Sequence, residues 1–188
     1  MEAPLTPTLA ATRAVIMNER GGEEADDALS SLIETYQGAM IILASQKDTS
    51  TEQAWALIEL AWLVLWLDGD VDEVQSWLNQ AQKLAPMDEK ALQRFDGWIS
   101  YRRGFDEDAA ATLEPLAKDD PAAKLGLALI RSDQGRRQDA ARLLLDLVRT
   151  DAGSLIGVWS RDRLAAMLGT PIPMTDEAGR MTELIDAI

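Results

Sequence analysis

The sequence contains no histidine and no cysteine among its 188 residues. The lack of cysteine excludes disulfides and thiolate nucleophiles, and the lack of both residue types removes the usual zinc ligands. Without histidine, Ser-His-Asp triads and imidazole acid–base catalysis are excluded as well. Because most enzyme classes need one of these groups, we expect a protein that is not an enzyme and that holds no metal and no cofactor.

Positive charge is also scarce, since 18 lysines and arginines stand against 32 aspartates and glutamates and the formal net charge is −14. A strongly negative surface repels phosphate backbones, so we expect no nucleic-acid partner and instead a neutral or basic protein or peptide. The excess acid lies within residues 1–120, whereas residues 121–188 carry nine acids and nine cations, eight of them arginine. Arginine suits bidentate contact with carboxylates, although a well-solvated surface explains the same residues.

Apolar runs are too short to span a bilayer, which needs about 20 residues. The most apolar run covers residues 54–67, where 14 residues are interrupted by Glu59. We therefore expect no membrane insertion and a helix buried on most sides, with a partner-binding or dimer face as the alternative. The first residues have an early acid and lack the basic and apolar regions of a signal peptide. The lack of cysteine is compatible with any compartment, and cytoplasm is the default expectation.

Apolar residues recur at three- and four-residue spacing, and no window alternates for long enough to predict a strand. The segments with this spacing are residues 9–17, 28–43, 55–67, 71–84, 91–101, 109–116, 122–130, 140–148, 155–168 and 178–188. Capping residues precede several segments. They are Ser50 with Gln53, Asp88, Asp106, Ser154, Thr175, and Asp120 followed by Pro121. The pattern predicts an all-α fold of about ten helices.

Four glycines, Gly69, Gly104, Gly135 and Gly169, each follow a helical segment, where a left-handed residue commonly ends a helix. Their spacings are 35, 31 and 34 residues, which is typical of a helix-turn-helix solenoid. The helices after the first three glycines repeat an apolar seam at positions i, i+4 and i+7. Its members are Val74, Leu78, Ala81, Ala109, Leu113, Leu116, Ala140, Leu144 and Leu147.

Together with Pro86, Pro121 and the small residue Gly97, this pattern resembles the tetratricopeptide repeat family over about residues 54–152. Departures from the family pattern are Trp62 in place of a small residue and Ala152 in place of a closing proline. We expect residues 1–188 to form one domain, and the resemblance implies that it is built as an α-α solenoid. Residues 1–50 would form an N-terminal helical pair or cap, residues 54–152 three repeats, and residues 153–188 a degenerate fourth unit or cap.

The resemblance also implies a groove, lined by the first helix of each pair, that binds a protein or peptide segment. The register selects as partner-binding residues Arg94, Trp98, Tyr101 and Arg102 in the second repeat, Glu59 and Trp66 in the first, and Leu125 in the third. Cations beside aromatic side chains suit a peptide anchor, although packing between helices explains the aromatic residues as well. Glu59 lies within an apolar segment, so its carboxylate must reach water or find a cation.

Two acidic patterns suggest chemistry that the remaining residues do not support. Residues 68–72 match the opening of a calcium-binding EF-hand loop, but Glu73 and Asn79 stand where that loop needs glycine and glutamate. An acidic turn that starts the next helix explains the match. Paired acids such as Asp119 and Asp120 could serve acid–base catalysis, but they fall in predicted turns, where carboxylates stay solvated.

We therefore predict a non-catalytic protein-interaction module. The alternatives are an acidic export or assembly chaperone for an aggregation-prone client and, more remotely, a carboxylate-based helical enzyme with a buried acid pair. The apolar residues 185–188 either pack inward or make a homodimer contact, and a soluble region of a longer protein is also compatible with this end.

Overall fold

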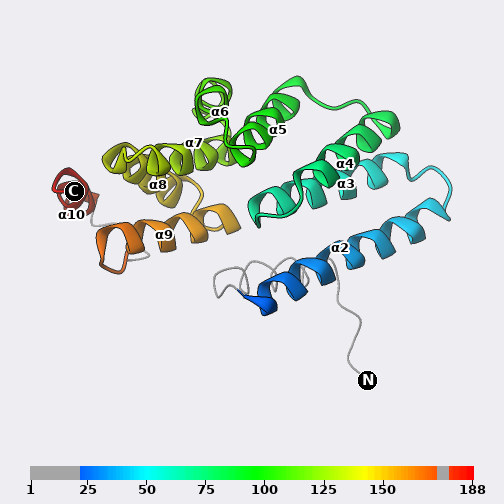
Figure 1. The fold of residues 1–188 in the computed structure, drawn as a ribbon, viewed down its shortest axis with the longest axis horizontal. Helices are drawn as coiled ribbons and strands as arrows, with labels where there is room; N and C mark the ends of the chain where they lie inside the picture. The colour runs from blue at the N-terminus through cyan, green and yellow to red at the C-terminus, as the bar shows by residue number, and fades with distance from the viewer. Residues whose placement is uncertain (1–21, 173–177) are drawn as a thin grey trace. The chain divides into compact units, whose positions relative to one another are not determined.

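A computed structural model describes residues 22–172 and 178–188, and all regular structure in these residues is α-helical (Figure 1). This confirms the all-α fold. The helices are α2 (Glu23–Ala44), α3 (Ser50–Trp66), α4 (Val71–Leu84), α5 (Glu89–Arg102), α6 (Asp106–Leu113), α7 (Pro121–Asp133), α8 (Arg137–Thr150), α9 (Leu155–Leu168) and α10 (Ala178–Asp186). The helix expected over residues 9–17 and the expected cap Thr175 lie outside the described residues.

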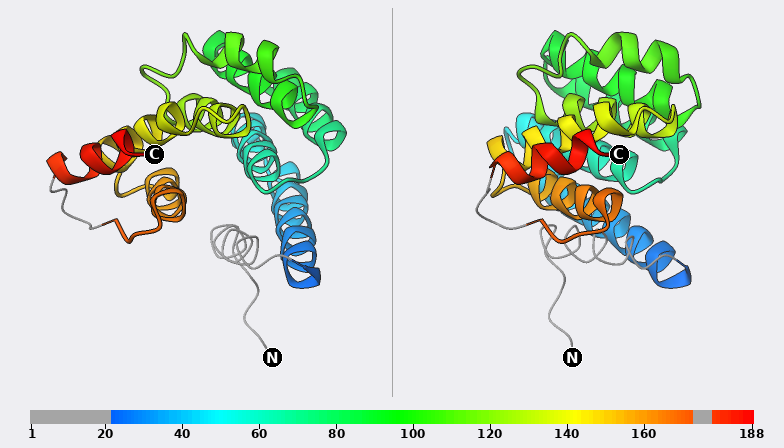
Figure 2. Two further views of the ribbon diagram at one scale, coloured as in Figure 1. Left: turned by 60° about the vertical axis from the view of Figure 1, so that its left-hand side comes forward. Right: turned by 90° about the vertical axis from the view of Figure 1, so that its left-hand side faces the viewer.

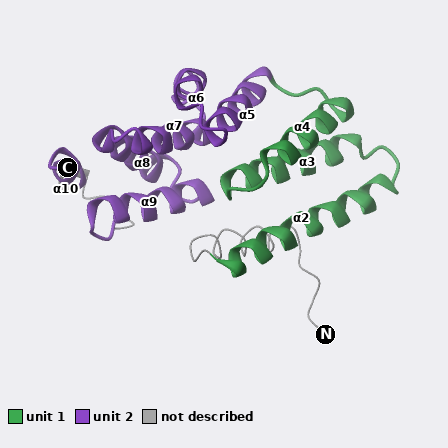
Figure 3. Ribbon diagram, in the orientation of Figure 1, with its two compact units in different colours: residues 1–88 green, residues 89–188 purple. Residues whose placement is uncertain are grey.

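The chain divides into two compact units, Met1–Asp88 and Glu89–Ile188 (Figure 3). In the first unit, α3 packs against both α2 and α4. In the second unit, α5 pairs with α6 and α7 with α8, and α9 packs against α8 (Figures 1 and 2). The boundary falls after the first expected repeat. The assignment of residues 1–188 to one domain stays a prediction.

Packing between successive pairs gives the second unit the character of a helical repeat. Helix α7 contacts both members of the preceding pair, α5 and α6, and α10 packs against α8. All nine members of the seam predicted from the glycine period are buried, with at most 9% of each residue exposed. The i, i+4, i+7 pattern therefore marked the buried face of the second helix of each pair, although Leu116 lies in the turn after α6.

Two glycines let the helices of the second unit approach closely. A Cβ atom on Gly97 of α5 would lie 2.6 Å from Cγ of Leu113 in α6. A Cβ atom on Gly126 of α7 would lie 2.8 Å from Cδ1 of Leu113 and 2.9 Å from the Trp98 indole. Leu113 and Trp98 therefore lie at the junction of α5, α6 and α7, and the helix backbones meet there because these positions lack side chains.

Three of the four glycines that were expected to be left-handed after a helix have this conformation. Gly104, Gly135 and Gly169 are left-handed, with φ of 80°, 74° and 65°. The expectation for Gly69 was wrong, because Asp68 takes the left-handed position, with φ of 67°. A Cβ atom on Gly69 would lie only 2.4 Å from Cγ1 of Val64, so this glycine is needed for close packing rather than for its φ. Aspartate is among the few side chains that tolerate this backbone conformation.

Two of the expected helix caps are confirmed by side-chain hydrogen bonds. Asp120 accepts from the backbone N–H groups of Ala122 and Ala123, and Ser154 accepts from that of Gly157. Ser50 and Asp106 are the first residues of their helices instead of the caps. Those two predictions were wrong by one residue, because a polar residue in the first turn resembles a cap in sequence.

Helix α6 is shorter than the apolar pattern predicted, since it ends at Leu113 and not at Leu116. Pro115 explains the difference, because its backbone nitrogen carries no hydrogen and cannot donate the next helical hydrogen bond, although Glu114 before it still has helical backbone angles. Leu116 still lies in the core, but it does so from a turn.

Candidate functional site

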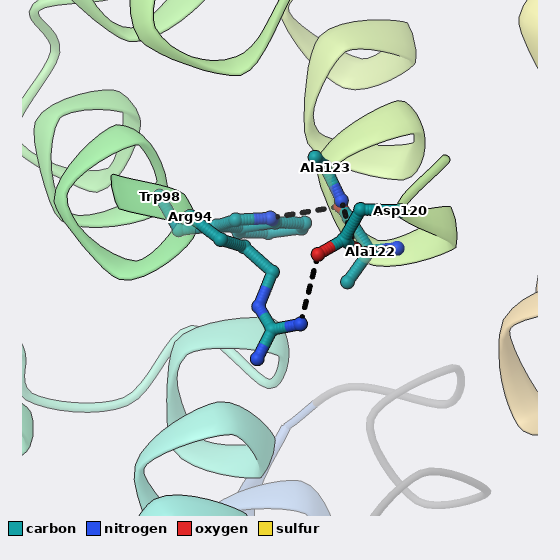
Figure 4. A network of polar contacts seen from close by, with 5 residues as sticks. All are labelled: Arg94, Trp98, Asp120, Ala122 and Ala123. Carbon is teal, nitrogen blue, oxygen red and sulfur yellow. Dashed lines mark hydrogen bonds and ion pairs between the residues drawn. The ribbon is translucent and has the colours of Figure 1, made fainter. Parts of the chain in front are cut away.

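Trp98 lies in the core of the second unit, with 1% of its surface exposed. Its indole N–H donates a hydrogen bond of 2.9 Å to the backbone oxygen of Ala122, at the start of α7 (Figure 4). Buried tryptophans usually find such a partner because an unpaired N–H in the core destabilises the fold. Trp98 therefore joins α5 to the first turn of α7. This position agrees with the alternative that packing between helices explains the aromatic residues of α5.

Arg94 lies one turn before Trp98 and is also tied to the start of α7. Its Nη1 donates to Oδ2 of Asp120 over 2.9 Å, and the two side chains are 23% and 22% exposed. The other carboxylate oxygen of Asp120 accepts from the N–H groups of Ala122 and Ala123 at 2.9 and 3.1 Å. One carboxylate thus caps α7 and positions Arg94 (Figure 4).

Tyr101 continues the same side of α5 and is half-buried. Its hydroxyl donates to Oδ2 of Asp133, at the end of α7, over 2.7 Å. Its ring meets the Trp98 ring edge-on, with centroids 6.1 Å apart. Burial is the main cause that raises the pKa of Tyr101, and the hydrogen bond to Asp133 and the charge of that carboxylate raise it further.

Arg102 completes this part of α5 and is likewise half-buried, and burial lowers the pKa of its guanidinium. The structure therefore brings Arg94, Tyr101 and Arg102 together along one helix, with Trp98 in the core beside them. We refer to the three partly exposed residues, Arg94, Tyr101 and Arg102, as the α5 face. The role of the α5 face and of Trp98 in partner binding stays a prediction.

The other predicted site residues lie in different surroundings. Leu125 in α7 is fully buried, and Trp66 in α3 is 7% exposed, with its ring centroid 6.2 Å from that of Trp62. Glu59 is exposed, so its carboxylate reaches water. Burial chiefly raises the pKa of Tyr36, and the nearby Glu59 carboxylate adds to this effect. Their partner-binding roles also stay predictions.

The acidic turn between α3 and α4 has a structural explanation. Oδ1 of Asp70 accepts from the N–H groups of Asp72 and Glu73 at 2.7 and 3.2 Å, which caps α4. Within residues 22–172 and 178–188, no group of three or more acids is placed to hold a metal ion. Each acid side chain placed in these ranges is exposed or half-buried, so the described part holds no buried acid pair.

Two surface features were not predicted as sites. Ile41 and Ile42 in α2 and Trp55 in α3 are 72%, 62% and 68% exposed, although all are large and apolar. Two adjacent isoleucines cannot both face the core from one helix, so the sequence could have indicated that at least one of Ile41 and Ile42 is exposed. The second feature is a group of arginines on α7 and α8, for which the arginine-rich composition of residues 121–188 was the signal.

No protein-family model, curated protein or solved structure matches this chain. None of the described helices combines the length and apolar character that crossing a bilayer requires. The likeness to tetratricopeptide repeats therefore rests on the sequence pattern alone.

Proposed function

We propose that this chain is a non-catalytic helical repeat protein that binds a protein or peptide segment on its α5 face. The observation that carries the proposal is the pair of hydrogen bonds that join α5 to α7, from Arg94 to Asp120 and from Tyr101 to Asp133. Each holds a long, partly exposed side chain in one conformation before a partner arrives.

Such preorganisation matters because immobilising a flexible side chain on binding costs about 0.5–1.5 kcal/mol. A side chain already held by an intramolecular hydrogen bond has lost much of that freedom on folding. Tyrosine and arginine are also the residue types that contribute most to binding at protein interfaces. The α5 face therefore combines favourable residue types with a fixed arrangement.

Charge favours neutral or basic partners over acidic ones. The chain carries a formal charge of −14, so its long-range field slows the approach of acidic proteins. On the α5 face itself, Asp120 and Asp133 accompany the cations and offset much of their charge. A segment with apolar or aromatic side chains beside a basic one would suit this mixed surface.

The test is capture of partners by the full chain, followed by affinity measurements with the purified partner. The double substitution Arg94→Gln with Tyr101→Phe removes both hydrogen bonds and leaves Trp98 in the core. We expect it to weaken binding at least tenfold, whereas Arg149→Gln on exposed α8 surface should change affinity less than twofold. Equal binding by both variants would remove the α5 face from consideration.

A second candidate is a chaperone that shields an aggregation-prone client, and the exposed Ile41, Ile42 and Trp55 favour it. Contiguous exposed apolar side chains often mark surfaces that contact other proteins, and Ile41 and Ile42 are adjacent in α2. The expected result is a client that is insoluble when expressed alone and soluble when expressed with this chain. Combined Ile42→Ser and Trp55→Ser substitutions should abolish that rescue. A partner that is soluble by itself would argue against this candidate.

A further inference from the structure

The stretch that forms α7, α8 and their connecting turn reverses the charge of the chain. Residues 121–150 contain six cations and three acids, a net charge of +3, within a chain of −14. Five of the six cations are arginines. Glu114 and Asp186, outside this stretch, contact two of these arginines, so the feature is a concentration of guanidinium donors rather than a net charge at one place.

Several of these arginines line a surface groove in the second unit. It is lined by the acids Glu114 and Asp139 and by five further residues, namely Arg131, Arg136 and Arg142, which we call its rim, and Leu127 and Leu143, which we call its floor. We call these five residues the arginine groove. Leu127 is buried and Leu143 half-buried, so the floor is apolar, while the rim offers guanidinium groups. The groove thus combines the two elements of a peptide site, a place for an apolar side chain and donors for charged ones.

The acidic partners of two rim arginines are themselves exposed. Arg136 contacts Asp139 at 2.6 Å, with side chains 51% and 41% exposed, and Arg142 contacts Asp186 at 2.8 Å, with both 56% exposed. Ion pairs this exposed are typically worth about 0.2–1 kcal/mol. An incoming carboxylate can therefore replace Asp139 or Asp186, or share the guanidinium, with little loss.

The third rim arginine is held more firmly than the other two. The Arg131 side chain is only 13% exposed and contacts Glu114 at 3.4 Å and the amide oxygen of Gln134 at 3.0 Å. A guanidinium carries five N–H donors, so each rim arginine has donors beyond those that bind these acidic and amide oxygens. Planar guanidinium groups pair with carboxylates in a bidentate manner, which favours carboxylates over other acceptors.

We propose that the arginine groove binds an acidic peptide segment in which carboxylate side chains flank an apolar one. The carboxylates would pair with Arg136 and Arg142, and the apolar side chain would lie on Leu127 and Leu143. This inference goes beyond the proposed function, because it concerns another surface and a partner of opposite charge. It does not depend on the α5 face.

A short peptide fits these observations better than nucleic acid does. Glu114 and Asp139 also line the groove, so a ligand with evenly spaced charges, such as a phosphate backbone, must place some of them beside these carboxylates. A peptide places only a few charges there and can orient each toward an arginine. It also uses the leucine floor, which a phosphate backbone does not.

The experiment is fluorescence anisotropy of the full chain with a labelled peptide of sequence Glu-Glu-Leu-Glu-Glu-Leu, compared with a matched peptide in which glutamine replaces each glutamate. We expect the acidic peptide to bind at least tenfold more tightly than the glutamine peptide. Arg136→Gln combined with Arg142→Gln should weaken it at least tenfold, whereas Arg103→Gln at the α5–α6 turn, an equal change of charge per site, should weaken it less than threefold.

Circular dichroism establishes that the double variant is folded, and Arg142→Gln alone replaces it in the comparison if it is not. Equal binding of the two peptides, or unchanged binding by the folded variant, overturns the proposal. Sedimentation of the chain without peptide tests a second copy as the occupant. Self-association that disappears in the Arg142→Gln variant would assign the groove to the second copy and overturn the peptide assignment.

Discussion

Arg94 and Asp120 are separated by 26 positions in the sequence, yet their side chains meet at 2.9 Å, where the Asp120 carboxylate also caps α7. The same carboxylate therefore serves the stability of one helix and the geometry of another. Because Arg94 belongs to the α5 face, the conformation of this proposed binding surface depends on the first turn of α7.

Substitutions at Asp120 separate its two roles. Asp120→Ala removes the cap and the ion pair and should lower the free energy of unfolding by about 1–2 kcal/mol. Asp120→Asn keeps a capping oxygen and loses only the charge, so it should lose less than about 1 kcal/mol. Urea unfolding followed by circular dichroism measures both. Asp70→Ala, which removes an equivalent cap from α4, is the matched control, with an expected loss of about 1 kcal/mol.

The capping role of Asp120 requires one ordering of these variants. Asp120→Asn must be milder than Asp120→Ala, and Arg94→Gln should resemble Asp120→Asn because each removes the ion pair alone. An asparagine variant as unstable as the alanine variant would show that the charge of Asp120, and not its capping oxygen, carries its contribution.

The close approach of α5, α6 and α7 predicts that glycine-to-alanine substitutions change stability in opposite directions at different positions. Gly38 lies within α2, and a Cβ atom there would meet nothing within 4 Å. Gly38→Ala should therefore raise stability by about 0.5–1 kcal/mol, because alanine favours the helix. Gly97→Ala and Gly126→Ala also favour the helix, but the new methyl group overpacks against Leu113 at a cost of about 1–3 kcal/mol. This cost should be larger than the gain, so both variants should be less stable than the unsubstituted chain.

Denaturant midpoints of the three glycine variants, each compared with the unsubstituted chain, provide the measurement. A midpoint for Gly97→Ala at or above that of the unsubstituted chain would contradict the packing around Leu113. A lowered midpoint for Gly38→Ala would show that this position is not open to solvent.

The inter-helix turn at Gly104 predicts a backbone effect. Its φ of 80° is unfavourable for any residue with a Cβ, so Gly104→Ala should lower stability by about 1–2 kcal/mol. Gly153 also has open space around a Cβ, and its φ lies outside the left-handed region. Gly153→Ala should therefore be neutral within about 0.5 kcal/mol or slightly stabilising, as thermal unfolding can measure. Equal losses at both positions would contradict the left-handed turn.

The tyrosines predict a loss of stability at alkaline pH. Burial raises the pKa of Tyr36 and of Tyr101 in the folded chain above the ordinary value of about 10. The unfolded chain then releases tyrosine protons more readily than the folded one. The stabilisation from this difference is fully present below about pH 10 and is lost as the pH rises from there toward the folded pKa.

Absorbance at 295 nm between pH 9 and 12 reports tyrosine ionisation and so checks this prediction. We expect little ionisation at pH 10–11 while the chain stays folded, followed by ionisation together with unfolding. Tyr101→Phe should flatten the decline in stability above pH 10. A simple titration with a midpoint of about 10 in the folded chain would contradict the burial of Tyr36 and the half-buried, hydrogen-bonded position of Tyr101.

The helix pairs and their buried seam could be predicted from the sequence because both depend on local spacing. A period near 34 residues and the i, i+4, i+7 pattern are properties of the chain before it folds. The left-handed turn residue after α3 could not be assigned in this way. Asp68 takes that conformation, and Gly69 is required one position later by its approach to Val64, which only packing reveals.

The candidate sites were harder to predict from the sequence, because they depend on contacts between residues that are far apart along the chain. The sequence register grouped Trp98 with Arg94 and Tyr101, but it could not show that Trp98 donates to Ala122 in the core while Tyr101 reaches Asp133. Those partners lie 24 and 32 positions away. The arginine groove likewise forms only where α7 and α8 bring Arg131 and Arg142 to one hollow. Composition indicated the arginines but not their convergence.

The central claim, that the α5 face contacts a partner, is tested most directly by site-specific photo-crosslinking. The chain carries benzoylphenylalanine in place of Tyr101 or, as a control, in place of Arg149, and each form is irradiated with a partner captured by the unsubstituted chain. We predict a covalent complex from position 101 and none from position 149. Crosslinking from position 149 without crosslinking from position 101 would contradict the claim.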